Sequence, residues 1–127
     1  MKIIISNQSE LPIYAQIKEQ IKEQILNGQI PEGTVLPSIR NLAKEVGCSV
    51  ITTSRAYSDL EAEGFISSAQ GRGSIVLSQN NDLLREQYLK RIEEGLFTAI
   101  QTARLIHLSR EELMTMAKML WDTADEP

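Results

Sequence analysis

Apolar residues recur at helical spacing along most of the chain, beginning with residues 12–27. Isoleucines there stand at every fourth position, which is typical of one face of an amphipathic helix. Pro12 suits the first turn of such a helix, and the Asn-Gly pair at 27–28 suits its end. The predicted face consists of Ile13, Ile17, Ile21 and Ile25. Residues 29–37 contain a Pro-Glu-Gly turn and are predicted to form a loop.

Two shorter amphipathic segments follow, separated by a tight glycine turn. The first is predicted to run from Ser38, a natural N-cap, to about Val46. The second begins after Ser49, another N-cap residue, and ends at Gly64. Two short helices joined in this way form a helix-turn-helix pattern. The inner face of the second helix is predicted to be Thr53, Ala56, Tyr57 and Leu60.

The pattern then changes to two β-prone runs, residues 65–66 and 74–77, joined by the sequence SSAQGRG. This arrangement predicts a β-hairpin with Arg72 between Gly71 and Gly73 at its tip. A phosphate-binding loop needs a helix after its glycines, whereas β-branched residues follow here. The nucleotide-binding alternative is therefore disfavoured. A tip that touches a partner and a plain solvated turn remain open.

The last third of the chain predicts two more helices. The first covers residues 83–106, where apolar residues alternate at spacings of three and four. Ser109 and Glu112 predict a capping box that starts the second. Because two such helices are too small to be stable alone, we expect them to pair with a second copy of the chain; folding back on the first helix is the alternative. A close approach of another helix would explain why a glycine, Gly95, stands inside the first of these helices. The predicted seam consists of Leu89, Ile92, Leu96, Ala99, Ala103, Ile106, Leu113, Met116 and Leu120.

Composition narrows the class of protein. A chain of 127 residues supports one core and a small appendage, and it holds a single cysteine and a single histidine. This excludes a cysteine-based zinc site, so we predict no metal, no cofactor and no enzyme activity. No apolar run is long enough for a membrane span, which favours a cytoplasmic protein without a membrane partner. Cys48 is interpreted as a small buried residue, with a redox sensor as the alternative.

The net charge of −4 argues at first against a nucleic-acid partner, but the acid is unevenly distributed. Residues 1–78 hold seven Lys/Arg and eight Asp/Glu, a net of −1, and residues 79–127 hold six and nine, a net of −3. Within the predicted helix after Ser49, Arg55 lies early, whereas Asp59, Glu61 and Glu63 come late. A recognition helix enters the major groove with its N-terminal residues near the bases, so this order keeps acid away from phosphate.

Residues 11–77 resemble the DNA-binding domain of GntR-type bacterial transcription regulators. The resemblance rests on the stretches PIYAQI, LPSIRNLA, RAYSDLEAEGFI and GRGSIV, and the RAY step is similar to the YtrA-like subfamily. It implies a mainly α fold with a small β-hairpin: a winged helix-turn-helix DNA-binding domain at 1–78 and a short two-helix dimerisation tail at 79–127. It further implies a homodimeric repressor that acts at a palindromic operator and controls transporter genes. The sequence identifies no effector; an inducer would bind the tail or its junction at 77–84.

The resemblance also implies that Arg40, in the LPSxR element, reaches the DNA. The full set of predicted DNA-binding residues is Ser38, Arg40, Ser49, Val50, Ile51, Thr52, Ser54, Arg55, Gly71, Arg72 and Gly73. Many relatives carry polar residues where this chain has Val50 and Ile51. Contacts of these two with thymine methyl groups would favour A·T steps, and packing in the core is the alternative. Besides these arginines, Lys44 and the lysines of the first helix are the expected phosphate contacts. So few cations leave a second hypothesis open, a winged-helix protein–protein assembly module with weak or no DNA binding.

Overall fold

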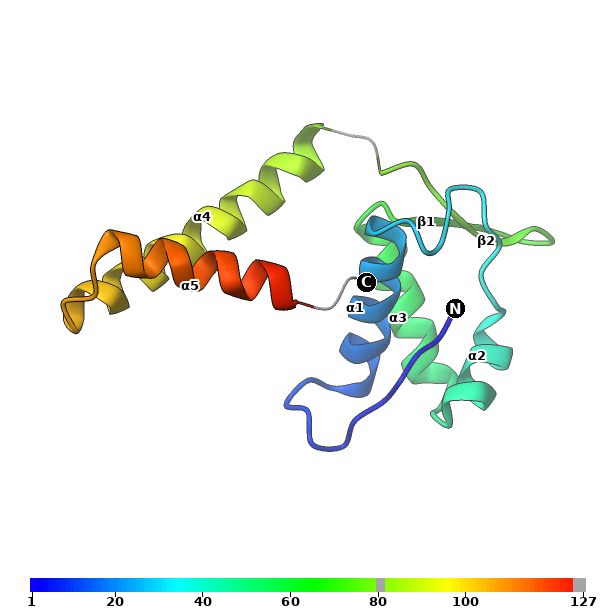
Figure 1. Cartoon of the computed structure of the whole chain (residues 1–127). Helices are drawn as coiled ribbons and strands as arrows, with labels where there is room; N and C mark the ends of the chain where they lie inside the picture. Colours follow the sequence, from blue (N-terminus) through cyan, green and yellow to red (C-terminus); the bar gives the residue numbers. More distant parts are fainter. Residues whose placement is uncertain (80–81, 125–127) are drawn as a thin grey trace. The chain divides into compact units, whose positions relative to one another are not determined.

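The computed structural model describes residues 1–79 and 82–124, which form two compact units, Met1–Asn80 and Asn81–Pro127. The mainly α fold class with a small hairpin is confirmed (Figure 1). The predicted junction at 77–84 lies partly outside the described residues. No helix in the described ranges is long and apolar enough to cross a membrane. The elements are α1 (Ile13–Leu26), α2 (Ile39–Val46), α3 (Val50–Ala62), β1 (Ile66–Ala69), β2 (Gly73–Val76), α4 (Asp82–Leu105) and α5 (Arg110–Thr123).

The core of the first unit lies where α1 and α2 pack against α3. Ile17 and Ile21 of α1 are fully buried, whereas Ile13 is 37% exposed, so the predicted isoleucine face enters the core from its second turn onward. The predicted inner face of α3 is confirmed, since Thr53, Ala56, Tyr57 and Leu60 are all buried. This packing leaves the opposite face of α3 in solvent.

Local signals set the helix boundaries of the helix-turn-helix. The Ser38 hydroxyl accepts the Asn41 N–H at 3.1 Å, as an N-cap does. Gly47 ends α2 with φ +82°, a left-handed conformation that favours glycine. Both predicted boundaries are confirmed, and the short turn after Gly47 brings α3 directly behind α2.

The wing is larger than predicted. β1 and β2 pair antiparallel from Ile66–Val76 to Ala69–Gly73, which leaves a loop of residues 70–72 instead of the seven-residue loop expected. Residues 33–36, predicted as a loop, instead lie along β2. The Gly33 N–H donates to the Val76 carbonyl at 2.9 Å, and the Leu36 N–H donates to the Ser74 carbonyl at 2.8 Å. The prediction failed because these partners are about 40 residues away in sequence, where a local pattern carries no signal.

Residues 1–11, for which the sequence suggested no role, run along α1 and are held by glutamine side chains. Gln16 and Gln20 lie one helical turn apart, and the side-chain amide of each both accepts and donates a backbone hydrogen bond. Gln20 accepts the Ile4 N–H at 2.8 Å and donates to the Ile4 carbonyl, and Gln16 does the same with Ser6. Gln24 donates to the Lys2 carbonyl at 2.8 Å. The N-terminal segment is therefore fixed to α1 from its second residue.

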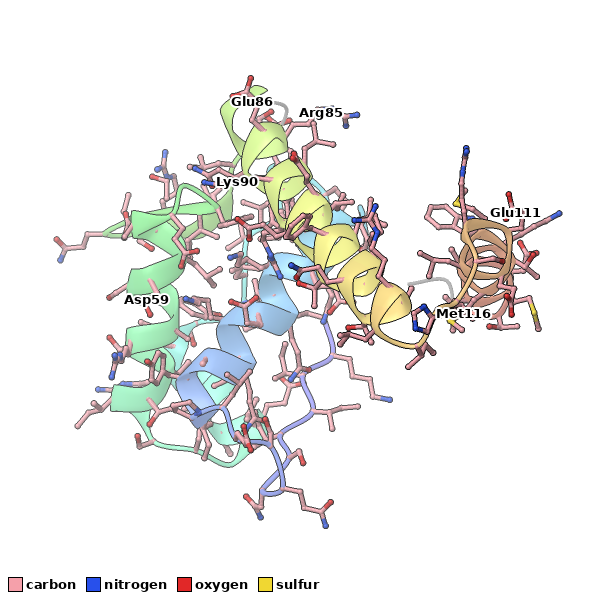
Figure 2. The ribbon with its side chains drawn as sticks, turned by 90° about the vertical axis from the view of Figure 1, so that its left-hand side faces the viewer. Asp59, Arg85, Glu86, Lys90, Glu111 and Met116 are labelled. Carbon is pink, nitrogen blue, oxygen red and sulfur yellow. The ribbon has the colours of Figure 1, made fainter. Side chains whose placement is uncertain are left out.

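In the second unit, a tight turn joins α4 to α5. His107 has φ +57°, and the Leu108 N–H donates to the Ala103 carbonyl at 2.9 Å, which closes α4. The predicted capping box is confirmed, because Ser109 accepts the Glu112 N–H and Glu112 accepts the Ser109 N–H. No residue of α5 is buried. The first turns of α4 carry the exposed side chains labelled in Figure 2: Arg85, Glu86 and Lys90.

Candidate nucleic-acid interface

The N-terminus of α3 presents hydroxyl groups and free backbone amides. The Ser49 hydroxyl accepts the Thr52 N–H at 3.0 Å and donates to the Thr52 hydroxyl at 2.9 Å. The Val50 and Ile51 N–H groups lie in the first turn, where a helix offers them no carbonyl. Together with the positive end of the helix dipole, these groups form an environment that favours an anion.

The exposed side of α3 carries most of the residues predicted to read DNA. Ile51 is 82% exposed and Val50 48%, so the alternative that they pack in the core is wrong. Thr52 and Ser54 are half-buried, and Arg55 is exposed. Two neighbouring apolar side chains are thus exposed at the start of a helix. They are free to contact a partner.

Thr53 faces the opposite way, as predicted. It is fully buried, and its hydroxyl donates to the Ser49 carbonyl at 3.2 Å. The Cys48 sulfur lies 3.2 Å from the same hydroxyl. Cys48 is half-buried rather than fully buried, because it sits in the turn at the edge of the helix pair. The interpretation of Cys48 as a buried residue is corrected to that extent.

Arg40 projects from the first turn of α2 and is exposed. The start of that helix is fixed by Tyr57, whose hydroxyl donates to the Pro37 carbonyl at 2.6 Å. Burial, with a smaller contribution from the Glu45 carboxylate, raises the pKa of Tyr57 far above its ordinary value, so the phenol stays protonated and remains a donor. α3 thereby sets where Ser38 and Arg40 stand.

The tip of the wing presents Arg72. Gly71 and Gly73 have φ +81° and +82°, so both glycines are needed for the left-handed backbone on either side of this residue. The Arg72 N–H donates to the Ala69 carbonyl at 3.1 Å, which closes the turn, and the side chain is exposed. A shallow groove connects this hairpin to the start of α2. Its lining residues are Val35, Leu36, Ser38, Ile39, Ser68, Ala69, Gln70, Gly73 and Ser74.

The lysines of α1, expected among the phosphate contacts, are engaged elsewhere. Lys18 and Lys22 place their ammonium groups 3.1 and 3.0 Å from the Glu63 carboxylate, just beyond the C-terminus of α3. Partial burial opposes ionisation of Glu63, but hydrogen bonds from the two lysines outweigh it, and its pKa is lowered. Asp59 lies in the same half of α3 (Figure 2). This end is an ion-pair cluster rather than a DNA face, so that expectation is corrected.

Comparison with known proteins identifies the group to which this architecture belongs. Residues 13–76 match the family model for bacterial regulatory proteins of the gntR family. The chain belongs to the gntR family. The predicted family and the predicted role as a transcription regulator, not an enzyme, are thereby confirmed. The alternative hypothesis of a protein–protein assembly module is not supported by this family match.

The similarity to individual proteins extends over 60% to 87% of the chain. The HTH-type transcriptional repressor YtrA of Bacillus subtilis (strain 168) is 37% identical over 111 residues, which are 87% of this chain and 85% of YtrA. The structure of YtrA from Sulfolobus acidocaldarius, a GntR-family transcription factor, is 39% identical and covers 74% of this chain and 96% of that one, with a TM-score of 0.61. The AraR DNA-binding domain in complex with operator ORX1 is 32% identical, covers 60% and 95%, and has a TM-score of 0.53.

Proposed function

We propose that this GntR protein is a cytoplasmic homodimer that binds operator DNA through α3 and represses transcription by occupying a promoter. The observation that carries the proposal is the division of α3 into two ends. Its first half exposes Ile51 and Arg55, while its second half carries Asp59 and Glu61. Just beyond its end, Glu63 pairs with Lys18 and Lys22. The complex of the related AraR domain with its operator supports the same use of the fold.

The exposed residues divide into base-reading and backbone-positioning groups. Val50 and Ile51 have the apolar surface to contact thymine methyl groups, which favours A·T steps. Ser49, Thr52 and Ser54 offer hydroxyls to phosphate, as do the free amides of the first turn. At the start of α2, Ser38 and Arg40 contact the flanking backbone or a base edge. At the wing, Arg72 enters the minor groove or pairs with phosphate, with Gly71 and Gly73 allowing close approach.

The second unit supplies the dimer contact in this proposal. The predicted seam on α4 is exposed in the chain, with Leu89 48%, Ile92 58% and Leu96 57% exposed. Ala103 is already buried within the chain, so it would add little buried surface to a dimer interface. α5 has no buried residue, and a 14-residue helix that leaves its apolar side chains in water is not stable without a partner. A second copy of the same seam is the simplest partner.

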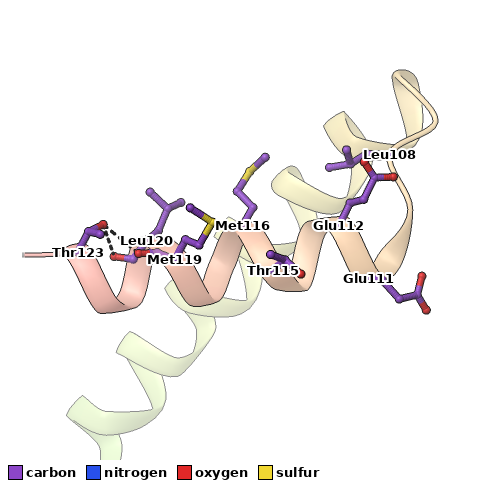
Figure 3. A pocket seen from close by; sticks show the side chains of 8 residues that line it. All are labelled: Leu108, Glu111, Glu112, Thr115, Met116, Met119, Leu120 and Thr123. Carbon is purple, nitrogen blue, oxygen red and sulfur yellow. Dashed lines mark hydrogen bonds between the residues drawn. The ribbon is translucent and has the colours of Figure 1, made fainter.

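An apolar groove on α5 supports the same proposal (Figure 3). Met116, Met119 and Leu120 are 49%, 63% and 64% exposed within it, and Glu111 and Glu112 lie near the start of the helix. Flexible methionine side chains adapt to a facing helix. A dimer formed here would present two α3 helices to half-sites about one helical turn, roughly 34 Å, apart.

DNA binding is tested by titrating the protein against its own promoter region at several salt concentrations. Arg40→Ala and Arg72→Ala are each expected to weaken binding and to lower the salt slope by about one phosphate contact per subunit, a change of roughly 0.9 in log–log slope. Lys18→Gln is the matched control, since its lysine is paired with Glu63. The proposal fails if the protein does not bind its promoter specifically at low salt, or if neither arginine variant loses affinity.

Dimerisation is tested by sedimentation analysis of two charge substitutions on α4. Ile92→Arg places a cation in the seam and is expected to shift the protein toward monomer and weaken operator binding. Glu94→Arg, two residues away and off the seam, is expected to leave the association state unchanged. Equal behaviour of the two variants would exclude the seam as the interface.

A further inference from the structure

A tyrosine on α1 stacks against the arginine at the centre of α3. The Arg55 guanidinium carbon lies 3.7 Å from the centroid of the Tyr14 ring, closer than the 5.3 and 5.4 Å of the other cation–aromatic contacts in the described residues. No carboxylate in residues 1–79 and 82–124 pairs with Arg55. The aromatic face is therefore the partner that determines where this guanidinium group lies.

The Tyr14 ring is mounted on a fixed section of backbone. Gln16, two residues later, is buried and donates to the carbonyls of Ser6 at 3.0 Å and Leu11 at 2.9 Å. It also accepts the Ser6 N–H at 2.9 Å. The first turn of α1 is thus tied to the segment that precedes it. Tyr14 is half-buried, whereas Arg55 is exposed, so the ring is the rigid member of the pair.

Stacking leaves the hydrogen-bonding edge of the guanidinium group available. Its five N–H donors lie in the plane of the group, while the ring covers one face of that plane. Arg55 stands one turn after Ile51 on the exposed side of α3. A free arginine loses considerable rotamer freedom when it binds, so holding it in advance favours binding.

We propose that Tyr14 is a positioning residue for DNA recognition: it holds the Arg55 guanidinium so that its N–H edge meets an acceptor of the operator DNA. The inference rests on the proposed function, because it requires α3 to face DNA. Tyr14 itself does not touch the DNA. Its effect on affinity passes through Arg55.

The test is a double-mutant cycle on the full chain, with promoter DNA binding measured by fluorescence anisotropy. Tyr14→Leu is expected to weaken binding about two- to fivefold per subunit, and Tyr14→Phe, which keeps the ring, by less than about twofold. Arg55→Ala is expected to weaken binding about tenfold or more. Adding Tyr14→Leu to Arg55→Ala should then cause no further loss. Thermal unfolding without DNA reports any separate effect on the fold.

Three outcomes overturn the inference. If Tyr14→Leu weakens binding equally with and without Arg55, the ring acts through the stability of the unit and not through the arginine. If Arg55→Ala binds like the unaltered protein while Arg40→Ala does not, operator binding stands and the role of the Tyr14–Arg55 pair is refuted. If the unaltered protein shows no specific binding, the proposed function fails and this inference fails with it.

Discussion

Replacing Glu63 with glutamine distinguishes the lysines that stabilise the fold from the arginines that are proposed to face DNA. Glu63 binds both Lys18 and Lys22 at 3.1 and 3.0 Å, and its side chain is 36% exposed, whereas those of the lysines are 20% and 14% exposed. Exposed ion pairs contribute about 0.2–1 kcal/mol each, and solvent screens this one in part. We therefore expect Glu63→Gln to lower the free energy of unfolding by about 1 kcal/mol at pH 7.

The cost of Glu63→Gln in the free energy of unfolding should depend on pH. Because the lysines lower the pKa of Glu63 from its ordinary 4.5, ionised Glu63 stabilises the folded state. That contribution is complete above the pKa of the unfolded chain and disappears as the pH falls through the lower pKa of the folded chain. The cost of Glu63→Gln, measured by urea unfolding, should thus be largest at pH 7 and smaller at pH 3.

Glu19→Gln is the matched control for this experiment. The Glu19 carboxylate lies 3.8 Å from the Lys22 ammonium group, and its side chain is 49% exposed. Glu19→Gln should therefore lower the free energy of unfolding by less than about 0.3 kcal/mol at either pH. Equal costs for the two variants, or a Glu63→Gln cost that does not change between pH 7 and pH 3, would refute the reasoning. Operator binding should be unaffected by either substitution at pH 7.

Four further substitutions test the wing, the helix pair and the seam. Gly71→Ala and Gly73→Ala should each cost about 1–2 kcal/mol in urea unfolding, because both positions have a positive φ that strains an alanine; an unchanged unfolding midpoint in either variant would contradict this. Tyr57→Phe leaves the Pro37 carbonyl without its donor and should cost about 1–3 kcal/mol by the same measurement, while an unchanged midpoint would show that water replaces the hydroxyl. At Gly95 nothing lies within 4 Å of an added Cβ, so Gly95→Ala should stabilise a lone helix by about 1 kcal/mol. If a partner helix approaches Gly95 closely, the same substitution should instead weaken the dimer. Calorimetry at several protein concentrations distinguishes the two results.

Much of the first unit was predictable because its boundaries depend on neighbouring residues. Ser38 and Ser49 cap helices through amides three residues away, and Gly47 ends one through its own backbone conformation. The buried side of α3 followed from its 3.6-residue period. The same period leaves Ile51 and Arg55 on the outside, on the side of the helix predicted to face DNA.

The features that sequence reasoning missed depend on contacts between distant segments. Lys18 and Lys22 were assigned to phosphate because a count of charges has no direction; the packing of α1 on α3 turns them toward Glu63. Residues 33–36 join the wing through partners in β2. The pairing of Tyr14 with Arg55 left no signal either, because each residue has an ordinary place in its own helix.

The glutamine-held N-terminal segment has a practical consequence for handling the protein. Lys2 is bound to Gln24, near the end of α1 and far along that helix from Tyr14. An affinity tag joined before Met1 would therefore leave the molecule beside the last turns of α1, at a distance from the pair formed by Tyr14 and Arg55. Trimming residues 1–11 as if they were a loose end would instead strip Gln16 of its three backbone partners and loosen the turn on which Tyr14 is mounted.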